Sequence, residues 1–138
     1  MSTMLKRREV TQATLEYFAS KPFGWSTGGT CVHLVRKQLV GMGHKPPPMK
    51  AFRSAITAKK ALQSKGWKNL AEMMDGLLPA IAPARAIVGD VVEMPSDDEA
   101  FGALAVVIGN GRLMGYFGEA GLLTVVQPTV VPLAAWRT

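Results

Sequence analysis

The spacing of hydrophobic residues changes near residue 86, and this change constrains the fold more than any other feature of the 138-residue chain. Before that point, apolar residues recur three or four positions apart, which is the repeat of a helix with one buried face. After it, short apolar runs are separated by Gly, Pro, Asn and Asp, which is typical of strands and turns. The pattern predicts helices over residues 4–20, 31–40, 49–65 and 67–78.

The second half of the chain predicts an antiparallel sheet. Asn110-Gly111 separates two apolar runs, and this dipeptide is the strongest short signal for a β-hairpin. Pro132 favours an edge or irregular position for the last extended segment. We expect strands over 89–94, 102–109, 112–118, 122–126 and 129–136. Helices followed by antiparallel strands define the α+β class, so we expect one α+β domain over 1–138, mainly helical in 1–85 and mainly β in 86–138.

Charge is distributed unevenly along the chain. Residues 1–85 hold 14 Lys and Arg against 4 Asp and Glu, whereas residues 86–138 hold 2 against 6. The basic half is either a solvated helical surface or a face that docks on an acidic partner. Its lysines lack interleaved aromatic residues, which does not favour nucleic acid as that partner. No apolar run approaches the ~20 residues that span a bilayer, and we expect no secretory signal at the N-terminus.

Cys31 is the only cysteine, and it follows the loop GWSTGGT at the expected start of the second helix. Free N–H groups and the helix dipole favour a thiolate there, so the position suits a nucleophile. Cysteine is also typical of buried core positions, and an inert packing residue is the alternative. One cysteine and two histidines are too few ligands for the usual zinc site, and the sequence predicts no metal and no cofactor.

A catalytic thiol needs a base within hydrogen-bond reach. His33 lies two residues after Cys31, about 200° around a helix, and is expected to point away from it. His44 stands before three prolines in a loop that could fold back toward the thiol. Asp90 belongs to the turn Gly89-Asp90, which we expect it to cap or shape.

The order of these motifs resembles the NlpC-type cell-wall peptidases, small papain-like cysteine enzymes that cleave peptide or amide bonds in peptidoglycan. The matching stretches are WSTGGTCVHLV at 25–35, GDVVEM at 89–94 and ALAVVIGNGRLMGYFG at 103–118. The resemblance implies a papain-like fold, with N-terminal helices packed against a C-terminal antiparallel sheet. It also places Cys31 in the position of the nucleophile.

The chain departs from the peptidase pattern where the base belongs. In these enzymes a histidine begins the strand after the Gly-Asp strand, and here that position falls on Gly102 or Ala103, which cannot take a proton. The third polar residue of the peptidases falls on Met114, Gly115 or Tyr116, of which only Tyr116 is polar. The resemblance therefore implies a degenerate cysteine-hydrolase fold that lacks its catalytic base.

The whole chain is similar to a family of tailed-phage tail-assembly proteins with this fold. PFGWS at 22–26, GDVV at 89–92 and VPLAAWRT at 131–138 carry the similarity, and its most distinctive part is Trp136 with Arg137. It implies a non-catalytic component of the tail tip or baseplate, made in the host cytoplasm and carried in the virion. Other tail proteins are then its partners, and it could form an oligomer within the tail. The alternative is an active cysteine peptidase or amidase that cleaves peptidoglycan through Cys31.

Overall fold

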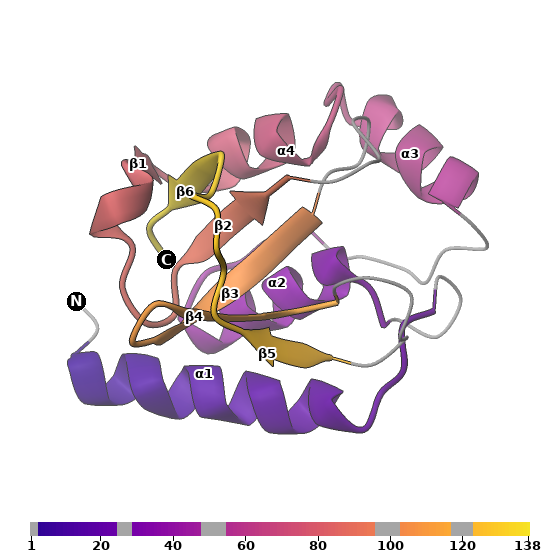
Figure 1. Cartoon of the computed structure of the whole chain (residues 1–138). Coiled ribbons are helices and arrows are strands. Elements are labelled where there is room, and N and C mark those ends of the chain that lie inside the picture. The colour runs from indigo at the N-terminus through magenta and orange to yellow at the C-terminus, as the bar shows by residue number, and fades with distance from the viewer. Residues whose placement is uncertain (1–2, 25–28, 48–54, 96–102, 117–122) are drawn as a thin grey trace.

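The computed structural model describes residues 3–24, 29–47, 55–95, 103–116 and 123–138 (Figure 1). The helices within these residues are α1 (Met4–Ala19), α2 (Cys31–Gly41), α3 (Ala55–Ser64) and α4 (Leu70–Leu77). The strands are β1 (Ala80–Ile81), β2 (Val91–Met94), β3 (Ala103–Gly109), β4 (Arg112–Gly115), β5 (Thr124–Val126) and β6 (Ala134–Trp136), and a short 3₁₀ helix covers Pro83–Arg85. Helices precede most of the sheet along the chain, which confirms the α+β class.

The described strands form one antiparallel sheet in the order β1-β6-β2-β3-β4-β5. The β3–β4 hairpin is confirmed, since Gly109 pairs with Arg112 and both turn residues, Asn110 and Gly111, have positive φ of 55° and 73°. Positive φ at both positions is what a type I′ turn requires. Pro132 lies in the irregular stretch before β6, but β6 itself is an interior strand between β1 and β2. The irregular position expected for Pro132 is therefore confirmed, and the residues of β6 itself, which have the N–H groups that proline lacks, pair on both sides.

One strand of the sheet lies where the sequence predicts no regular structure. The stretch PAIAPARAIVGD at 79–90 is rich in Ala and Pro and predicts a linker, but it contains β1, which pairs with β6 through Ala80 with Trp136 and Ile81 with Ala135. The expected third helix is described from Ala55 onward, and its first part lies outside the described residues.

One face of the sheet is covered by helices. A single core cluster joins buried side chains of α2, α3 and α4 to Val91, Leu104, Val106, Met114 and Trp136 of the sheet. In Figure 1, α2 runs behind β3 and β4, while α4 lies beside β2 and β6. Burial of this apolar surface provides the main driving force for folding.

The other face carries a smaller apolar cluster. Its strand residues include Val92, Ala105, Val107, Leu113 and Ala135. Successive side chains of a strand point to opposite faces, so the neighbours Leu104 and Ala105 belong to different clusters. This alternation decides which residues of β3 can approach a side chain of α2.

Helix α1 contacts the rest of the molecule through a mainly polar face. Its buried residues are Arg7, Thr11, Thr14 and Phe18, at the spacing of one helix face. The helical repeat of the sequence puts Arg7 on the solvated face and Leu5 on the apolar stripe, but Arg7 is only 5% exposed and Leu5 is 67% exposed. The expected face of α1 is therefore wrong near its start, because a buried carboxylate from another part of the chain binds Arg7.

Candidate functional site

Cys31 is the first residue of α2, as the sequence predicts. Thr30 is the N-cap, and its hydroxyl accepts the backbone N–H of His33 at 3.2 Å. Cys31 is partly buried and packs against the main core cluster on the helix-covered face of the sheet. The sulfur therefore lies at a helix start, in contact with apolar side chains.

Burial raises the pKa of the Cys31 thiol from 9.0 to about 11. Removal of the thiolate from water has the largest effect, and hydrogen bonds from the backbone of Leu104, Cys31 and Val32 oppose it only in part. The stabilisation of a thiolate by the helix start is thus outweighed by desolvation. At neutral pH this group is a neutral thiol, which is a poor nucleophile.

The His33 ring contacts the N-cap residue of α2, whereas His44 lies at the far end of that helix. The Nδ1 atom of His33 lies 2.7 Å from the Thr30 hydroxyl oxygen, so its ring turns toward the N-cap residue. His44 follows the other end of α2, where its N–H donates to the carbonyl of Leu39 at 2.9 Å. An 11-residue helix is roughly 16 Å long. The suggested fold-back of His44 is therefore wrong, because the length of α2 separates it from Cys31.

Strand β3 brings its backbone, but no imidazole, to the thiol. Leu104 shares the core cluster of Cys31 and hydrogen-bonds the thiol through its backbone. Ala103 packs against the cluster on the opposite face, so a side chain at position 103 points away from Cys31. Gly102, the other expected position of the base, lies outside the described residues. The Cys31 thiol is thus hydrogen-bonded by the backbone of β3 and of its own helix start.

Met114, at which the resemblance to the peptidases would place a third polar residue, lies in strand β4, and Tyr116 directly follows that strand. Met114 is fully buried in the main core cluster. Tyr116 donates its hydroxyl to the carbonyl of Lys21 at 2.9 Å, and burial raises the pKa of that phenol. The Tyr116 hydroxyl therefore anchors the segment after α1, and it does not orient an imidazole.

A second polar constellation is centred on Asp90, a fully buried carboxylate at the start of β2. It forms a salt bridge with Arg7 of α1, and its Oδ1 accepts the backbone N–H of Thr138 at 3.0 Å. Its Oδ2 accepts the N–H of Ile87 at 3.0 Å. The Nε of Arg137 lies 3.0 Å from the same Oδ2 in an ion pair that lacks hydrogen-bond alignment. Asp90 therefore joins three segments that are far apart in sequence.

Gly89 makes room for this constellation. Its φ is +93°, and a Cβ atom there would lie 3.3 Å from both the Gln38 amide nitrogen and the Thr11 hydroxyl. The same amide nitrogen donates to Thr11 at 3.0 Å and to the carbonyl of Gly89 at 3.3 Å. The turn was expected to be shaped by Asp90, and the N–H of Ile87 confirms that role. Sequence reasoning did not foresee Arg7 as the partner, although an arginine within a helical pattern and a Gly-Asp turn are both visible signals.

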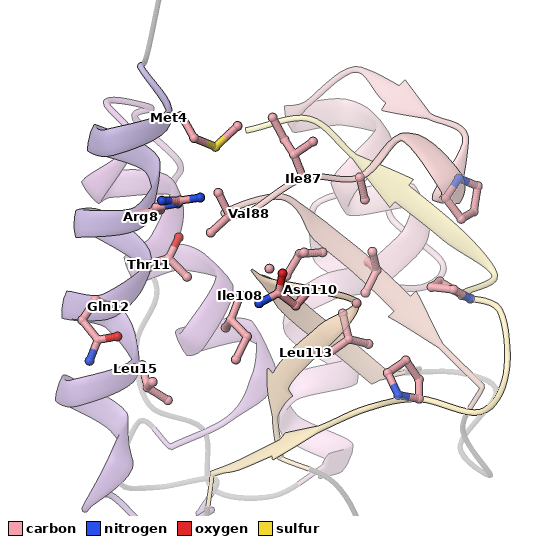
Figure 2. Close-up of a pocket in the computed structure, with 18 residues that line it drawn as sticks. Met4, Arg8, Thr11, Gln12, Leu15, Ile87, Val88, Ile108, Asn110 and Leu113 are labelled. Atoms are coloured by element: carbon pink, nitrogen blue, oxygen red, sulfur yellow. The ribbon is translucent and has the colours of Figure 1, made fainter.

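A cleft of about 800 Å³ opens on the sheet face opposite Cys31. Figure 2 shows Arg8 and Gln12 along α1, across the cleft from Asn110 of the hairpin. Val107 and Leu113 of the smaller apolar cluster line its floor. The cleft does not include Cys31, so the thiol and the cleft are separate features.

A family model described as a domain of unknown function, DUF6950, matches residues 4–138. The chain belongs to the DUF6950 family. Searches of curated proteins and of solved structures gave no match. The matched range includes the Asp90 constellation and the Cys31 helix of this DUF6950 chain.

Metal binding and membrane insertion can both be judged for the DUF6950 chain. Within the described residues, no cluster of three or more His, Cys, Asp and Glu side chains could hold a metal ion. None of the helices in the described part is both long and apolar enough to cross a membrane.

Proposed function

We propose that this DUF6950 domain is a non-catalytic structural component of a bacteriophage tail, at the tail tip or baseplate, built on a degenerate NlpC-type cysteine-peptidase fold. It acts by binding other tail proteins, is made in the host cytoplasm and is carried in the virion. The tail assignment rests on the similarity of the PFGWS, GDVV and VPLAAWRT stretches. The non-catalytic assignment rests on the environment of Cys31.

The single observation that supports loss of catalysis is a neutral thiol held by backbone groups. With a pKa of about 11, the thiolate fraction at pH 7 is on the order of 10⁻⁴. The described part of β3 presents Leu104 to the core around Cys31 and turns Ala103 to the opposite face. A cysteine hydrolase instead needs a thiolate and an imidazole within hydrogen-bond reach.

Thiol chemistry tests the non-catalytic assignment directly. Iodoacetamide should alkylate Cys31 about a hundredfold more slowly at pH 8 than an exposed cysteine does, because alkylation requires the thiolate. Purified wild type and Cys31→Ala should be equally inactive on isolated peptidoglycan, measured as released fragments by mass spectrometry, beside an active NlpC-type enzyme as the positive control. Release by wild type that Cys31→Ala abolishes would overturn the assignment.

Particle composition tests the structural role. Mass spectrometry of purified tailed particles should find this protein at a fixed copy number relative to the other tail proteins. Its absence from particles that are otherwise complete would contradict a structural role in the virion. Labelled cross-links to tail-tip or baseplate proteins would identify its neighbours.

The alternative function is an active cysteine peptidase or amidase that acts on peptidoglycan. The observation that favours it is the position of Cys31 at the first turn of α2, where free N–H groups favour a thiolate. Activity would require the partner or substrate to supply an imidazole and to lower the thiol pKa. The peptidoglycan experiment therefore needs a repeat with assembled particles, in which any such partner is present.

A further inference from the structure

Arg7 and Arg8 are adjacent in sequence and have opposite environments. Arg7 is buried and binds Asp90, the carbonyl of Val88 and the hydroxyl of Thr138. Arg8 is exposed and lines the cleft (Figure 2). Within the part of the chain that the structure describes, the Arg8 side chain forms no hydrogen bond and no ion pair. A cation that is unpaired at the edge of a cleft is available to an anionic group of a ligand.

The cleft is otherwise uncharged. Among the described residues that line it, Arg8 is the only charged side chain. The floor is apolar, formed by Val92, Val107 and Leu113 of the sheet, and Asn110 lies at the opposite edge (Figure 2). The volume of about 800 Å³ is within the range of about 300–1,000 Å³ of ligand sites. An occupant that matches these walls combines a carboxylate with apolar groups.

Glu16 places a negative charge on α1 beside the cleft residue Gln12. It accepts a hydrogen bond from the Gln12 amide at 3.2 Å, and Gln12 lines the cleft. Eight residues separate Arg8 from Glu16, which is roughly 12 Å along a helix. A carboxylate is therefore favoured near Arg8 and disfavoured near Glu16, so an anionic ligand has one preferred orientation.

The surface beside the cleft favours a polymer over a small molecule. Pro128 and Pro132 line the cleft, and Val130, Val131 and Leu133 between and beside them are 54%, 76% and 64% exposed. Met4, another lining residue, is 47% exposed. Exposed apolar side chains beside a cleft are typical of protein interaction sites. A partner that fills the cleft can continue over this segment, which a small ligand cannot do.

We propose that the cleft between α1 and the uncovered sheet face docks an extended acidic segment of a partner protein, whose carboxylate binds Arg8 while its apolar side chains cover Val107, Leu113 and the 128–133 segment. This inference rests on the proposed binding function, because it states where and through which chemistry a partner docks. Charge complementarity carries it: an unpaired arginine at an otherwise uncharged, partly apolar cleft.

Selection of displayed peptides tests the inference and needs no identified partner. A random peptide library is selected on immobilised wild-type protein, with removal of peptides that also bind Arg8→Glu. The enriched peptides should carry Asp or Glu flanked by apolar residues. Fluorescence anisotropy with a labelled selected peptide then measures affinity for each variant, and circular dichroism confirms that each variant is folded.

The variants separate charge, position and shape. Arg8→Glu should lower the affinity for the selected peptide at least about tenfold, as expected for loss of a charged hydrogen bond. Lys6→Glu makes the same charge change on the same helix but outside the cleft lining, and should change affinity less than about twofold. Gln12→Trp places a bulky side chain in the cleft and should abolish binding of the peptide. A peptide with its carboxylate residue changed to Arg should bind Arg8→Glu better than wild type.

Three results would overturn the inference. One is binding that does not depend on a carboxylate at Arg8, seen either as failure to enrich acidic peptides or as equal weakening of peptide binding by Arg8→Glu and Lys6→Glu. Another is binding of oleate in place of peptides, which would make the cleft a lipid site. The third is concentration-dependent self-association that Arg8→Glu removes, measured by sedimentation, which would make a second copy the occupant. If any of these results is obtained and the wild-type protein is found in tail particles, this inference is overturned but the proposed function is not.

Discussion

The buried Asp90 carboxylate provides the most discriminating test of how this fold is held together. Substitution of Asp90 by Ala removes the acceptor for Thr138 and Ile87 and leaves the Arg7 guanidinium, 5% exposed, without its counter-ion. The remaining charge cannot be rehydrated without opening the contact between α1 and the turn before β2. The variant therefore tests whether α1 is attached to the sheet through this ion pair.

The expected loss of stability is large relative to the total. Removal of one partner of a buried pair typically costs about 3–5 kcal/mol, and a small domain is stable by only about 5–15 kcal/mol. Arg7 keeps its hydrogen bond to the carbonyl of Val88, at 2.8 Å, which favours the lower part of that range. We expect Asp90→Ala to reduce the free energy of unfolding by about 3–4 kcal/mol.

Urea unfolding followed by circular dichroism measures this loss. Asp75→Asn is the matched control, because Asp75 is an exposed carboxylate that accepts one hydrogen bond, from the indole N–H of Trp136 at 2.9 Å. The control should cost less than about 1 kcal/mol, since asparagine keeps an acceptor oxygen. In a double-mutant cycle, Arg7→Met should cost less once Asp90 is absent, with a coupling energy of about 1–3 kcal/mol. Equal effects of Asp90→Ala and Asp75→Asn, or additive effects in the cycle, would refute the reasoning.

The remaining expectations concern a glycine, the thiol and an indole. Gly89→Ala should lower the free energy of unfolding by about 1–3 kcal/mol, because φ is +93° and the new Cβ crowds its neighbours. Gly66 has a φ of +86° but open space around it, so Gly66→Ala should lose only the stability due to backbone strain in the same urea titration. Folding raises the pKa of Cys31 from 9.0 to about 11, so its neutral thiol contributes stability below about pH 9 that is lost as the pH rises through about 11. Urea unfolding between these pH values should therefore show wild type losing stability relative to Cys31→Ala. Parallel stability curves for the two proteins would contradict the raised pKa. Trp136→Phe should lower the unfolding free energy by about 1–3 kcal/mol, because the hydrogen bond to Asp75 and part of the packing are lost. An unchanged thermal midpoint would exclude a stabilising role for the Trp136 indole.

Local patterns predicted the elements of this chain well. The helical repeat located α1, α2 and α4 to within about three residues at each end, and Asn110-Gly111 located the hairpin. These features depend on residues close together in sequence, through capping, turn geometry and hydrophobic periodicity. The same reasoning placed Cys31 at the start of α2, where Thr30 caps the helix.

Contacts between distant segments were not predictable in the same way. The interior position of β6 depends on its pairing with both β1 and β2. The side of β3 that faces Cys31 is set by sheet register, which places Leu104 near the thiol and Ala103 on the other face. A shift of one residue would reverse these faces, so reasoning from a motif alone could not choose between neighbouring positions.

The sequence by itself determined an α+β chain with its only cysteine at the start of a helix. Only the tertiary structure decided that Arg7 is buried while Arg8 is exposed in a cleft, because Asp90 approaches α1 from 83 residues away in the chain. The tertiary structure also decided whether the Cys31 thiol ionises readily. The helix start favours a thiolate, but packing against the core removes water from the sulfur and raises its pKa, and that burial exists only once α2 and the sheet have come together.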